Sequence, residues 1–228
     1  MSAPLADVTW PEAERLPVDA VLAVPIGSTE QHGPHLPISA DTEIAVALAA
    51  ILARARPTAA LAPALPYGSS GEHEGFAGTL SIGQYAFELA LVELCRSASA
   101  TFTRILLINA HGGNAEPLDR AQRRLRAEGR DVRAWAPSWG GGDAHAGRTE
   151  TSLMLALAPE QVRWSEASAG NVAPVATLLP RLRARGVRAL SPNGVLGDPA
   201  GASAEEGREL LRVAGEELIV TVDAWARQ

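Results

Sequence analysis

Short apolar runs alternate along the chain with longer stretches in which apolar residues recur at helical spacing. The short runs predict buried strands at residues 19–26, 59–62, 104–109 and 131–135. The longer stretches predict helices at 41–56, 81–97, 115–128, 148–157, 177–185 and 203–227. Ser39 or Asp41 is expected to open the first helix, and Ser81 to cap the second. This alternation predicts an α/β layer fold with a mostly parallel sheet, in a single domain spanning residues 1–228.

Two segments rich in glycine, at 63–79 and 137–147, predict loops. In a parallel sheet, ligands bind beyond the carboxyl ends of the strands. Glu30 and His32 follow the first predicted strand, His111 follows the strand at 104–109, and His145 follows the strand at 131–135. We therefore expect three loops that are distant in sequence to converge on one edge of the sheet.

Charge and composition narrow the class of protein. The net charge is −6 and no run of basic residues occurs, so we expect no nucleic-acid partner. All 20 basic residues are arginine, which excludes both a P-loop lysine and a Schiff-base lysine. The single cysteine, Cys95, can form no intrachain disulfide. The first twenty residues do not resemble a signal peptide, and the longest apolar stretch, 44–53, is about half of the ~20 residues that span a bilayer. We expect a cytoplasmic protein without membrane contact.

The first candidate cluster combines Glu30, His32 and Asp41. In extended backbone, residues i and i+2 point to the same side, so Glu30 and His32 can present an oxygen and a nitrogen to one centre. Asp41 lies at a predicted helix start, where a carboxylate stays ionised and can bridge two cations. In the alternative interpretation, Asp41 only caps the helix and Glu30 is a solvated loop charge. This segment alone leaves both interpretations open.

Two further clusters each supply a histidine. His111 is followed by Gly112 and Gly113, which let the backbone approach a metal or substrate closely. His145 precedes a helix that has Glu150 in its first turns; in the alternative, Glu150 is only a favourable first-turn charge and His145 is exposed. The chain has no Gly-x-Ser-x-Gly elbow, no Gly-x-Gly-x-x-Gly fingerprint and no His-Glu-x-x-His helix. Imidazole and carboxylate ligands without sulfur suit Zn, Fe(II) or Mn.

These motifs resemble the creatininase family. The matching stretches follow the family order: GSTEQHGPHLP (27–37), Asp41-Thr42, PYGSSGEHEGFAGTLSI (66–82), NAHGGN (109–114), HAGRTETS (145–152) and GVLGDP (194–199). The resemblance implies a three-layer α/β/α fold, a homo-oligomer with six copies, and two divalent metal ions per chain at the strand ends. It implies that Glu30, Asp41 and His111 hold one metal ion. It also implies that His32, Asp41 and Glu150 hold the other, with Asp41 bridging the two.

Two departures from the family pattern bear on the substrate. Family members that act on creatinine carry a Tyr-Glu pair where this chain has Gly112-Gly113, and a glutamate where it has Ala144. The second departure removes a side chain that handles the small cyclic substrate, so creatinine is not the expected substrate. The TWPE start (9–12), DAHAGRTETS and SPNGVLGDP are similar to the mycofactocin branch, whose members trim a radical-modified precursor peptide at its C-terminal end. A small cyclic amide or a formamide is the alternative substrate.

The expected mechanism is hydrolysis of an amide by a hydroxide held between the metals. We expect His145 to pass a proton to the leaving amine, and the amides of Gly112 and Gly113 to donate hydrogen bonds to the oxyanion. Arg148 lies close to His145 in the sequence and can pair with the free carboxylate of a peptide. An exposed arginine at a helix start is an equally supported interpretation of Arg148.

Overall fold

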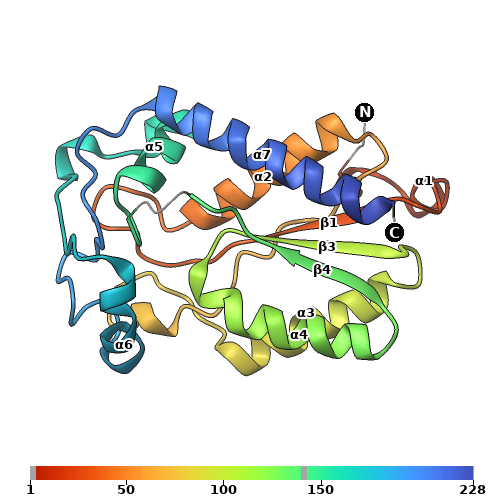
Figure 1. Ribbon diagram of the computed structural model, residues 1–228, viewed down its shortest axis with the longest axis horizontal. Coiled ribbons are helices and arrows are strands. Elements are labelled where there is room, and N and C mark those ends of the chain that lie inside the picture. The colour runs from red at the N-terminus through yellow and green to blue at the C-terminus, as the bar shows by residue number, and fades with distance from the viewer. Residues whose placement is uncertain (1–3, 140–142, 228) are drawn as a thin grey trace.

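Four parallel strands form the central sheet of the computed structural model, which describes residues 4–139 and 143–227. Their order across the sheet is β2 (Ala60–Leu61), β1 (Val21–Ile26), β3 (Arg104–Asn109) and β4 (Asp131–Trp135). The register of the β1–β3 pair runs from Val21 beside Arg104 to Ile26 beside Asn109. β1 is buried along its whole length because it has a strand on each side and helices over both faces, which explains its continuous apolar run (Figure 1).

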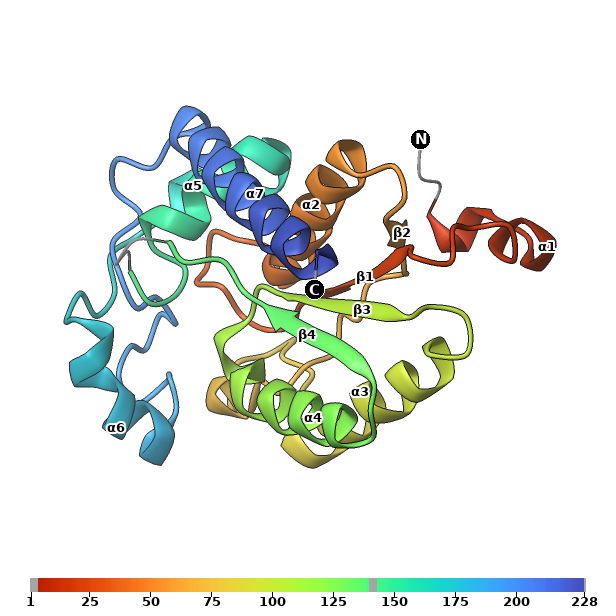
Figure 2. The same cartoon turned by 45° about the vertical axis from the view of Figure 1, so that its right-hand side comes forward.

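Helices cover both faces of the sheet, so the fold has three layers (Figures 1 and 2). On one face lie α2 (Ala40–Ala55), α5 (Arg148–Leu157) and α7 (Ala204–Ala226), and on the other lie α3 (Gln84–Ala98) and α4 (Ala115–Ala127). Each face has its own apolar core. Leu106 of β3 packs into the first core and Leu107 into the second, because successive side chains of a strand point to opposite faces.

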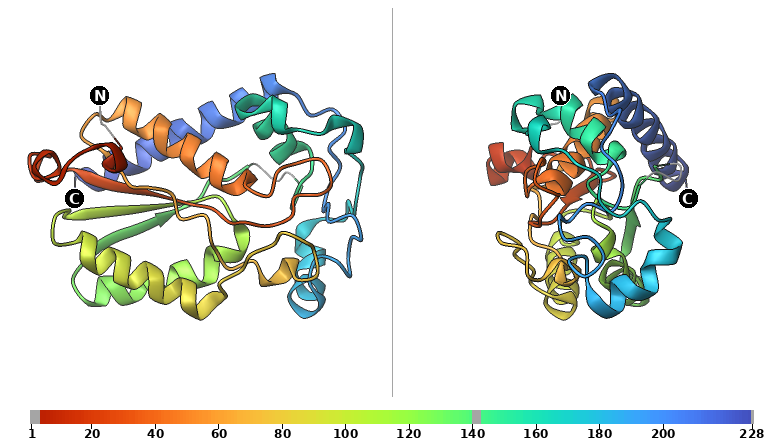
Figure 3. Two further views of the ribbon diagram at one scale, coloured as in Figure 1. Left: turned by 180° about the vertical axis from the view of Figure 1, so that it is seen from behind. Right: turned by 90° about the vertical axis from the view of Figure 1, so that its left-hand side faces the viewer.

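The remaining helices lie outside these layers. α1 (Trp10–Ala13) precedes β1, and α6 (Val175–Arg185) lies beyond the carboxyl ends of the strands (Figure 3). Short 3-10 turns occur at Leu5–Asp7, Gly71–His73, Gly112–Asn114, Pro159–Gln161 and Trp164–Glu166. Within residues 4–139 and 143–227, no helix is both long enough and apolar enough to cross a membrane.

The predicted α/β fold and parallel sheet are confirmed, and the predicted strands and helices all form with small shifts at their ends. The capping role expected of Ser81 is wrong, because α3 begins three residues later, after Gly83 with φ 76°. Ser81 Oγ instead accepts hydrogen bonds from the backbone N–H groups of Ser70 (2.9 Å) and Gly83 (3.2 Å), which closes the preceding loop. Of the loop predicted at 137–147, residues 140–142 lie outside the described part of the chain.

Candidate metal centre

Three loops at the carboxyl edge of the sheet bring the five predicted ligands together. Glu30 and His32 follow the end of β1, and His111 follows the end of β3. Asp41 is in the first turn of α2, and Glu150 is in the first turn of α5. Because parallel strands end at one edge, side chains that are far apart in the sequence meet there.

The loop after β1 packs tightly against the start of α2, which places Asp41 beside it. A Cβ atom on Gly27 would overlap the backbone of Thr42, so only glycine permits this approach. Thr42 Oγ1 donates to the carbonyl oxygen of Ser28 at 3.0 Å, and Ser28 Oγ donates to Asp41 Oδ2 at 2.6 Å. These contacts hold the Asp41 carboxylate in one position at the amino end of the helix, where the helix dipole favours its charge.

The Asp41 carboxylate lies between two imidazoles. Its Oδ1 is 3.2 Å from His32 Nε2, and its Oδ2 is 3.2 Å from His111 Nδ1. On the outer side of these rings, Glu30 Oε2 is 3.2 Å from His111 Nε2, and Glu150 Oε2 is 3.9 Å from His32 Nε2. Two groups of residues therefore share Asp41. One consists of Glu30, Asp41 and His111, and the other of His32, Asp41 and Glu150. Within each group, the candidate ligand atoms lie within 4.8 Å of one another. These groups coincide with the two ligand sets expected from the sequence.

The Glu30 carboxylate indicates that a cation belongs in this centre. Its side chain is 0% exposed, and neither oxygen receives a hydrogen bond from the described residues. A buried carboxylate without a partner costs several kcal/mol, so such groups are paired or coordinate metal ions. The nearest nitrogen atoms are His73 Nε2 and His111 Nε2, each at 3.2 Å. A divalent ion between Glu30, Asp41 and His111 would supply the missing partner, so the residues present fit a metal centre.

Backbone carbonyl groups determine which nitrogen of each histidine ligand is free. The carbonyl oxygen of Glu30 lies 3.1 Å from His32 Nδ1, and that of Ser69 lies 3.1 Å from His111 Nε2. A carbonyl oxygen can only accept, so these two ring nitrogens carry the protons and donate them. The other two ring nitrogens, His32 Nε2 and His111 Nδ1, both face Asp41, and a metal ion that replaces their protons would leave the outer hydrogen bonds in place. Outer hydrogen bonds of this kind orient imidazoles for metal binding.

Burial and charge shift the acidities of the ligands in opposite directions. Burial raises the pKa of Glu150 to about 7 despite the attraction of His32. Burial is the largest influence on Glu30 and disfavours its charged form, but His111 and His73 together outweigh it and lower the Glu30 pKa to about 2. Burial lowers the pKa of His32, yet the Asp41 charge and hydrogen bond overcome it and raise the pKa to about 10. Protons and metal ions compete for these atoms, so metal binding releases protons.

His145 lies against the ligand cluster. Its Nδ1 is 3.9 Å from both Glu30 Oε1 and Glu150 Oε2, and its ring centroid is 4.4 Å from that of His32. Backbone hydrogen bonds in both directions with Leu196 hold the His145 loop in place. The position of the ring is compatible with proton transfer at Nδ1, the nitrogen that faces the cluster.

The sequence reasoning missed His73. This buried imidazole lies 3.2 Å from Glu30 Oε1 through Nε2, and its ring centroid is 4.5 Å from that of His145. Its place in the 66–82 stretch, one of those that resemble the creatininase family, is the signal that the sequence offers for it. All four histidines of the centre come from different loops, so their proximity depends on the folded chain.

The structure brings Gly112 and Gly113 to the centre and places Arg148 away from it. Both glycines line the cavity that contains the ligands. Arg148 does not line that cavity; its Nε donates to both carboxylate oxygens of Glu206 on α7, at 3.0 and 2.9 Å. Binding of a substrate carboxylate by Arg148 therefore remains a prediction, and the structure gives this side chain another partner.

A cavity of about 1060 Å³ opens from the metal centre toward α6. Its inner end contains Glu30, Asp41, His111, His145 and Glu150, with Glu72 and His73 beside them. Its outer wall carries apolar side chains from α6 and the segment that follows it: Val175, Leu179, Leu182 and Val187. The cavity therefore combines the candidate metal centre at its inner end with a wall that has apolar side chains and also Arg183 and Arg185.

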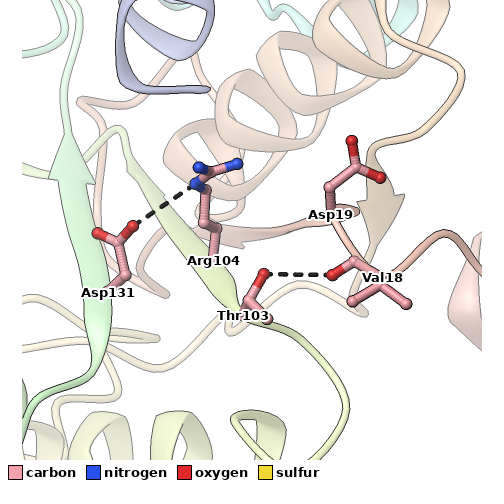
Figure 4. Close-up of a pocket in the computed structure, with 5 residues that line it drawn as sticks. All are labelled: Val18, Asp19, Thr103, Arg104 and Asp131. Atoms are coloured by element: carbon pink, nitrogen blue, oxygen red, sulfur yellow. Dashed lines mark hydrogen bonds and ion pairs between the residues drawn. The ribbon is translucent and has the colours of Figure 1, made fainter. Parts of the chain in front are cut away.

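A second hollow, of about 520 Å³, lies at the opposite edge of the sheet, where the strands begin (Figure 4). Arg104 faces Asp131 there at 3.5 Å, and Thr103 Oγ1 donates to the carbonyl oxygen of Val18 at 3.3 Å. Its lining contains no histidine and Arg104 is paired with Asp131, so we assign the candidate chemistry to the first cavity.

Comparison with known proteins agrees with this geometry. A family model described as Creatininase, Creatinine amidohydrolase, matches residues 6–222. The chain is 52% identical over 197 residues to a mycofactocin precursor peptide peptidase of Mycolicibacterium smegmatis, covering 84% of this chain and 79% of the relative. It is 47% identical over 225 residues to a protein of the same name from Mycobacterium ulcerans, covering 95% of this chain and 86% of the relative.

Solved creatininases have the same fold. A structure described as creatininase Mn aligns with a TM-score of 0.81 at 26% identity, covering 100% of both chains. A mutant creatininase described as a Zn-Zn type aligns with a TM-score of 0.81 at 25% identity, again over 100% of both chains. Since the family model spans most of the sequence and the ligand groups stand where the shared fold brings its loops together, this chain belongs to the creatininase family.

Proposed function

We propose that this chain is a dinuclear-metal amide hydrolase that cleaves the mycofactocin precursor peptide and releases its modified C-terminal residues. The observation that carries the metal-dependent activity is the pair of buried ligand groups that share Asp41. The names of relatives about half identical to this chain supply the substrate.

The size and lining of the cavity favour a peptide over a small amide. Its volume of about 1060 Å³ is just above the range of about 300–1,000 Å³ for drug-sized ligands. A small cyclic amide or a formamide, the alternative substrate class, would leave most of this space unfilled. The apolar wall of α6 can contact side chains of a peptide whose scissile bond lies at the metal centre.

The residues of the centre have distinct roles in this proposal. Two divalent metal ions, when bound, acidify water and polarise a carbonyl group. Glu30, Asp41 and His111 would hold one ion, and His32, Asp41 and Glu150 the other. His145 Nδ1 faces the cluster and can move a proton toward the leaving amine. The cavity-lining backbone at Gly112 and Gly113 offers N–H groups to an oxygen that gains charge.

We further propose two metal ions per chain, chosen among Zn, Fe(II) and Mn, because oxygen and nitrogen ligands without sulfur suit all three. Creatininase structures described with Mn and with Zn support the first and last of these metals. We also propose a single-domain chain, a cytoplasmic location and a homo-oligomer of six copies, which rest on the sequence and the family resemblance.

The test is turnover by the purified full chain loaded with Zn, Mn or Fe(II). We expect release of the C-terminal fragment from the modified precursor peptide, with kcat/KM at least about 100-fold above that for creatinine or formamides. Asp41→Asn should abolish both metal binding and turnover. Asp19→Asn, at the opposite edge of the sheet, is the matched control and should change neither. Faster turnover of the small amides than of the peptide would contradict the proposed substrate.

A further inference from the structure

Gln31 stands between two metal ligands in the sequence, and its own side chain is buried among the histidines of the centre. It is 6% exposed. Its Oε1 accepts a hydrogen bond from the backbone N–H of Gly33 at 2.8 Å. A backbone N–H can only donate, so the oxygen of the amide must point to Gly33 and the nitrogen must point the other way. The orientation of this amide is thus fixed by the chain itself.

The Gln31 amide nitrogen faces three groups and has only two hydrogens. Its Nε2 is 2.9 Å from His73 Nδ1, 3.0 Å from His145 Nε2 and 3.1 Å from the carbonyl oxygen of Gly194. The carbonyl of Gly194 is an acceptor and takes one hydrogen. The second hydrogen must go to one of the two imidazoles, and that choice decides the tautomer of both.

His145 settles the choice, because its Nε2 also lies 2.8 Å from the backbone carbonyl oxygen of Gln31. If this nitrogen carries a proton, it donates to that carbonyl, and the Gln31 amide is free to donate to His73 Nδ1. If it carries none, its lone pair faces the carbonyl oxygen, and either His73 or Gly194 receives no hydrogen. Only the first arrangement gives each of these facing atoms, namely His73 Nδ1, His145 Nε2 and the carbonyl oxygens of Gln31 and Gly194, a hydrogen-bond partner, as is usual for buried polar groups.

As a consequence, two imidazoles present opposite hydrogen-bonding groups to Glu30. His145, protonated on Nε2, turns the lone pair of Nδ1 toward Glu30 and Glu150, each 3.9 Å away. His73 accepts at Nδ1, so its proton is on Nε2, 3.2 Å from Glu30 Oε1. One ring therefore offers an acceptor to the reaction site and the other an N–H group.

We propose that Gln31 is a positioning residue that fixes His73 as the Nε2–H tautomer and, through its backbone carbonyl, fixes His145 with a free Nδ1. This inference assigns the atom through which His145 acts, and it rests on the proposed function only for its kinetic consequence. Packing supports the assignment: a Cβ atom on Gly194, which has φ 83°, would overlap Gln31 Oε1. The side-chain amide of Gln31 is thus packed closely against Gly194 and hydrogen-bonded to the backbone of Gly33.

The direct test is nitrogen NMR of the zinc-loaded full chain labelled with ¹⁵N-histidine. His73→Gln and His145→Gln variants assign the two rings. We expect both to carry the proton on Nε2. A proton on Nδ1 of either ring would overturn the proposal. Because this measurement needs no turnover, it can succeed or fail independently of the proposed peptidase activity.

Gln31→Glu tests the role of the side chain, because it keeps the acceptor for Gly33 and replaces both N–H donors by an oxygen. We expect His73 to move its proton to Nδ1, while His145 keeps Nε2–H through the unchanged backbone carbonyl. We expect kcat to fall about 10- to 100-fold, as for other residues that orient a ligand shell, with KM and metal content within about twofold. An unchanged His73 tautomer would overturn the role of the side chain.

His35→Gln is the matched control, because His35 is a buried histidine of the same loop whose Nε2 bonds to Thr151 Oγ1 at 2.9 Å, outside the Gln31 contacts. It should lower the melting temperature without moving the tautomer of His73 or changing kcat beyond about twofold. An equal loss of kcat in Gln31→Glu and His35→Gln would assign Gln31 a structural role only and overturn the proposal.

Discussion

Gly113→Ala adds one methyl group beside His111, a proposed metal ligand, and removes no polar atom from the centre. A Cβ atom at position 113 would lie 2.5 Å from His111 Nε2, and closer still to the carbonyl oxygen of Ser69 and the carboxylate of Glu72. Real Cβ atoms essentially never come within 3.0 Å of such atoms, so the overlap with the His111 ring alone is at least 0.5 Å. The Ser69 carbonyl belongs to the backbone and accepts the His111 proton, so His111 must move away from its position.

The size of the effect follows from the cost of overpacking, which is typically about 1–3 kcal/mol. At 1.36 kcal/mol for each factor of ten, this range corresponds to a loss of about 5- to 150-fold in affinity for the metal ion that His111 is proposed to bind. The backbone N–H of residue 113 remains in the alanine variant, so a hydrogen bond from it to substrate is not removed. The expected defect is therefore in metal binding first, with turnover restored in part by added metal.

Gly112→Ala is the matched control, because a Cβ atom at position 112 would meet nothing within 4 Å. Neither glycine has a positive φ, so alanine is compatible with the backbone at both positions. We expect Gly112→Ala to retain metal affinity and to gain up to about 1 kcal/mol in stability through the unfolded state. Metal competition with a chromophoric chelator measures both variants. Equal affinities of Gly113→Ala and Gly112→Ala would refute the reasoning.

Three further predictions concern charge. Arg148→Ala should leave KM for the peptide within about twofold of the wild-type value, because Arg148 pairs with Glu206 outside the cavity. A large rise in KM would instead support a contact between Arg148 and the substrate carboxylate. Hydrogen bonds from Arg96 lower the pKa of Glu128 to about 2, so the stabilisation that they give is complete above the unfolded pKa of 4.5 and is lost as the pH falls toward 2. The difference in melting temperature between wild type and Glu128→Gln should therefore shrink as the pH falls from 4.5 to 2. A constant difference over this interval would contradict the prediction. In chelator at neutral pH, Glu30→Gln should be less stable to thermal unfolding than wild type, because His111 and His73 lower the Glu30 pKa to about 2 and the folded chain therefore favours the ionised carboxylate. Equal or higher stability of the variant would contradict this pairing.

The sequence predicted the sheet and the ligand loops because both depend on local patterns. Buried parallel strands such as β3 are continuous apolar runs, and the loops after parallel strands must meet at one edge. The five expected ligands lie together there, with Asp41 between the two imidazoles as expected of a bridge.

What the sequence did not predict depends on contacts between distant segments. Gln31 and His73 are 42 positions apart, and Gln31 and His145 are 114 positions apart, so no local pattern reveals their shared hydrogen bonds. The partner of Arg148, Glu206, lies on the last helix, 58 positions away. Ser81 had the residue type of a helix cap, but Ser70 and Gly83 engage its oxygen in the loop instead.

The proposed metal ligands come from two loops and from the first turns of two helices, with Glu30 and Glu150 furthest apart in the sequence. No short fragment of the chain holds one complete ligand group, since each group joins segments separated by long loops whose closure costs entropy. We therefore expect the proposed metal ions to bind late during refolding, after β1 and β3 have paired and α5 has docked. Metal uptake after dilution from denaturant should lag behind the recovery of secondary structure, which makes uptake a stringent reporter of completed folding.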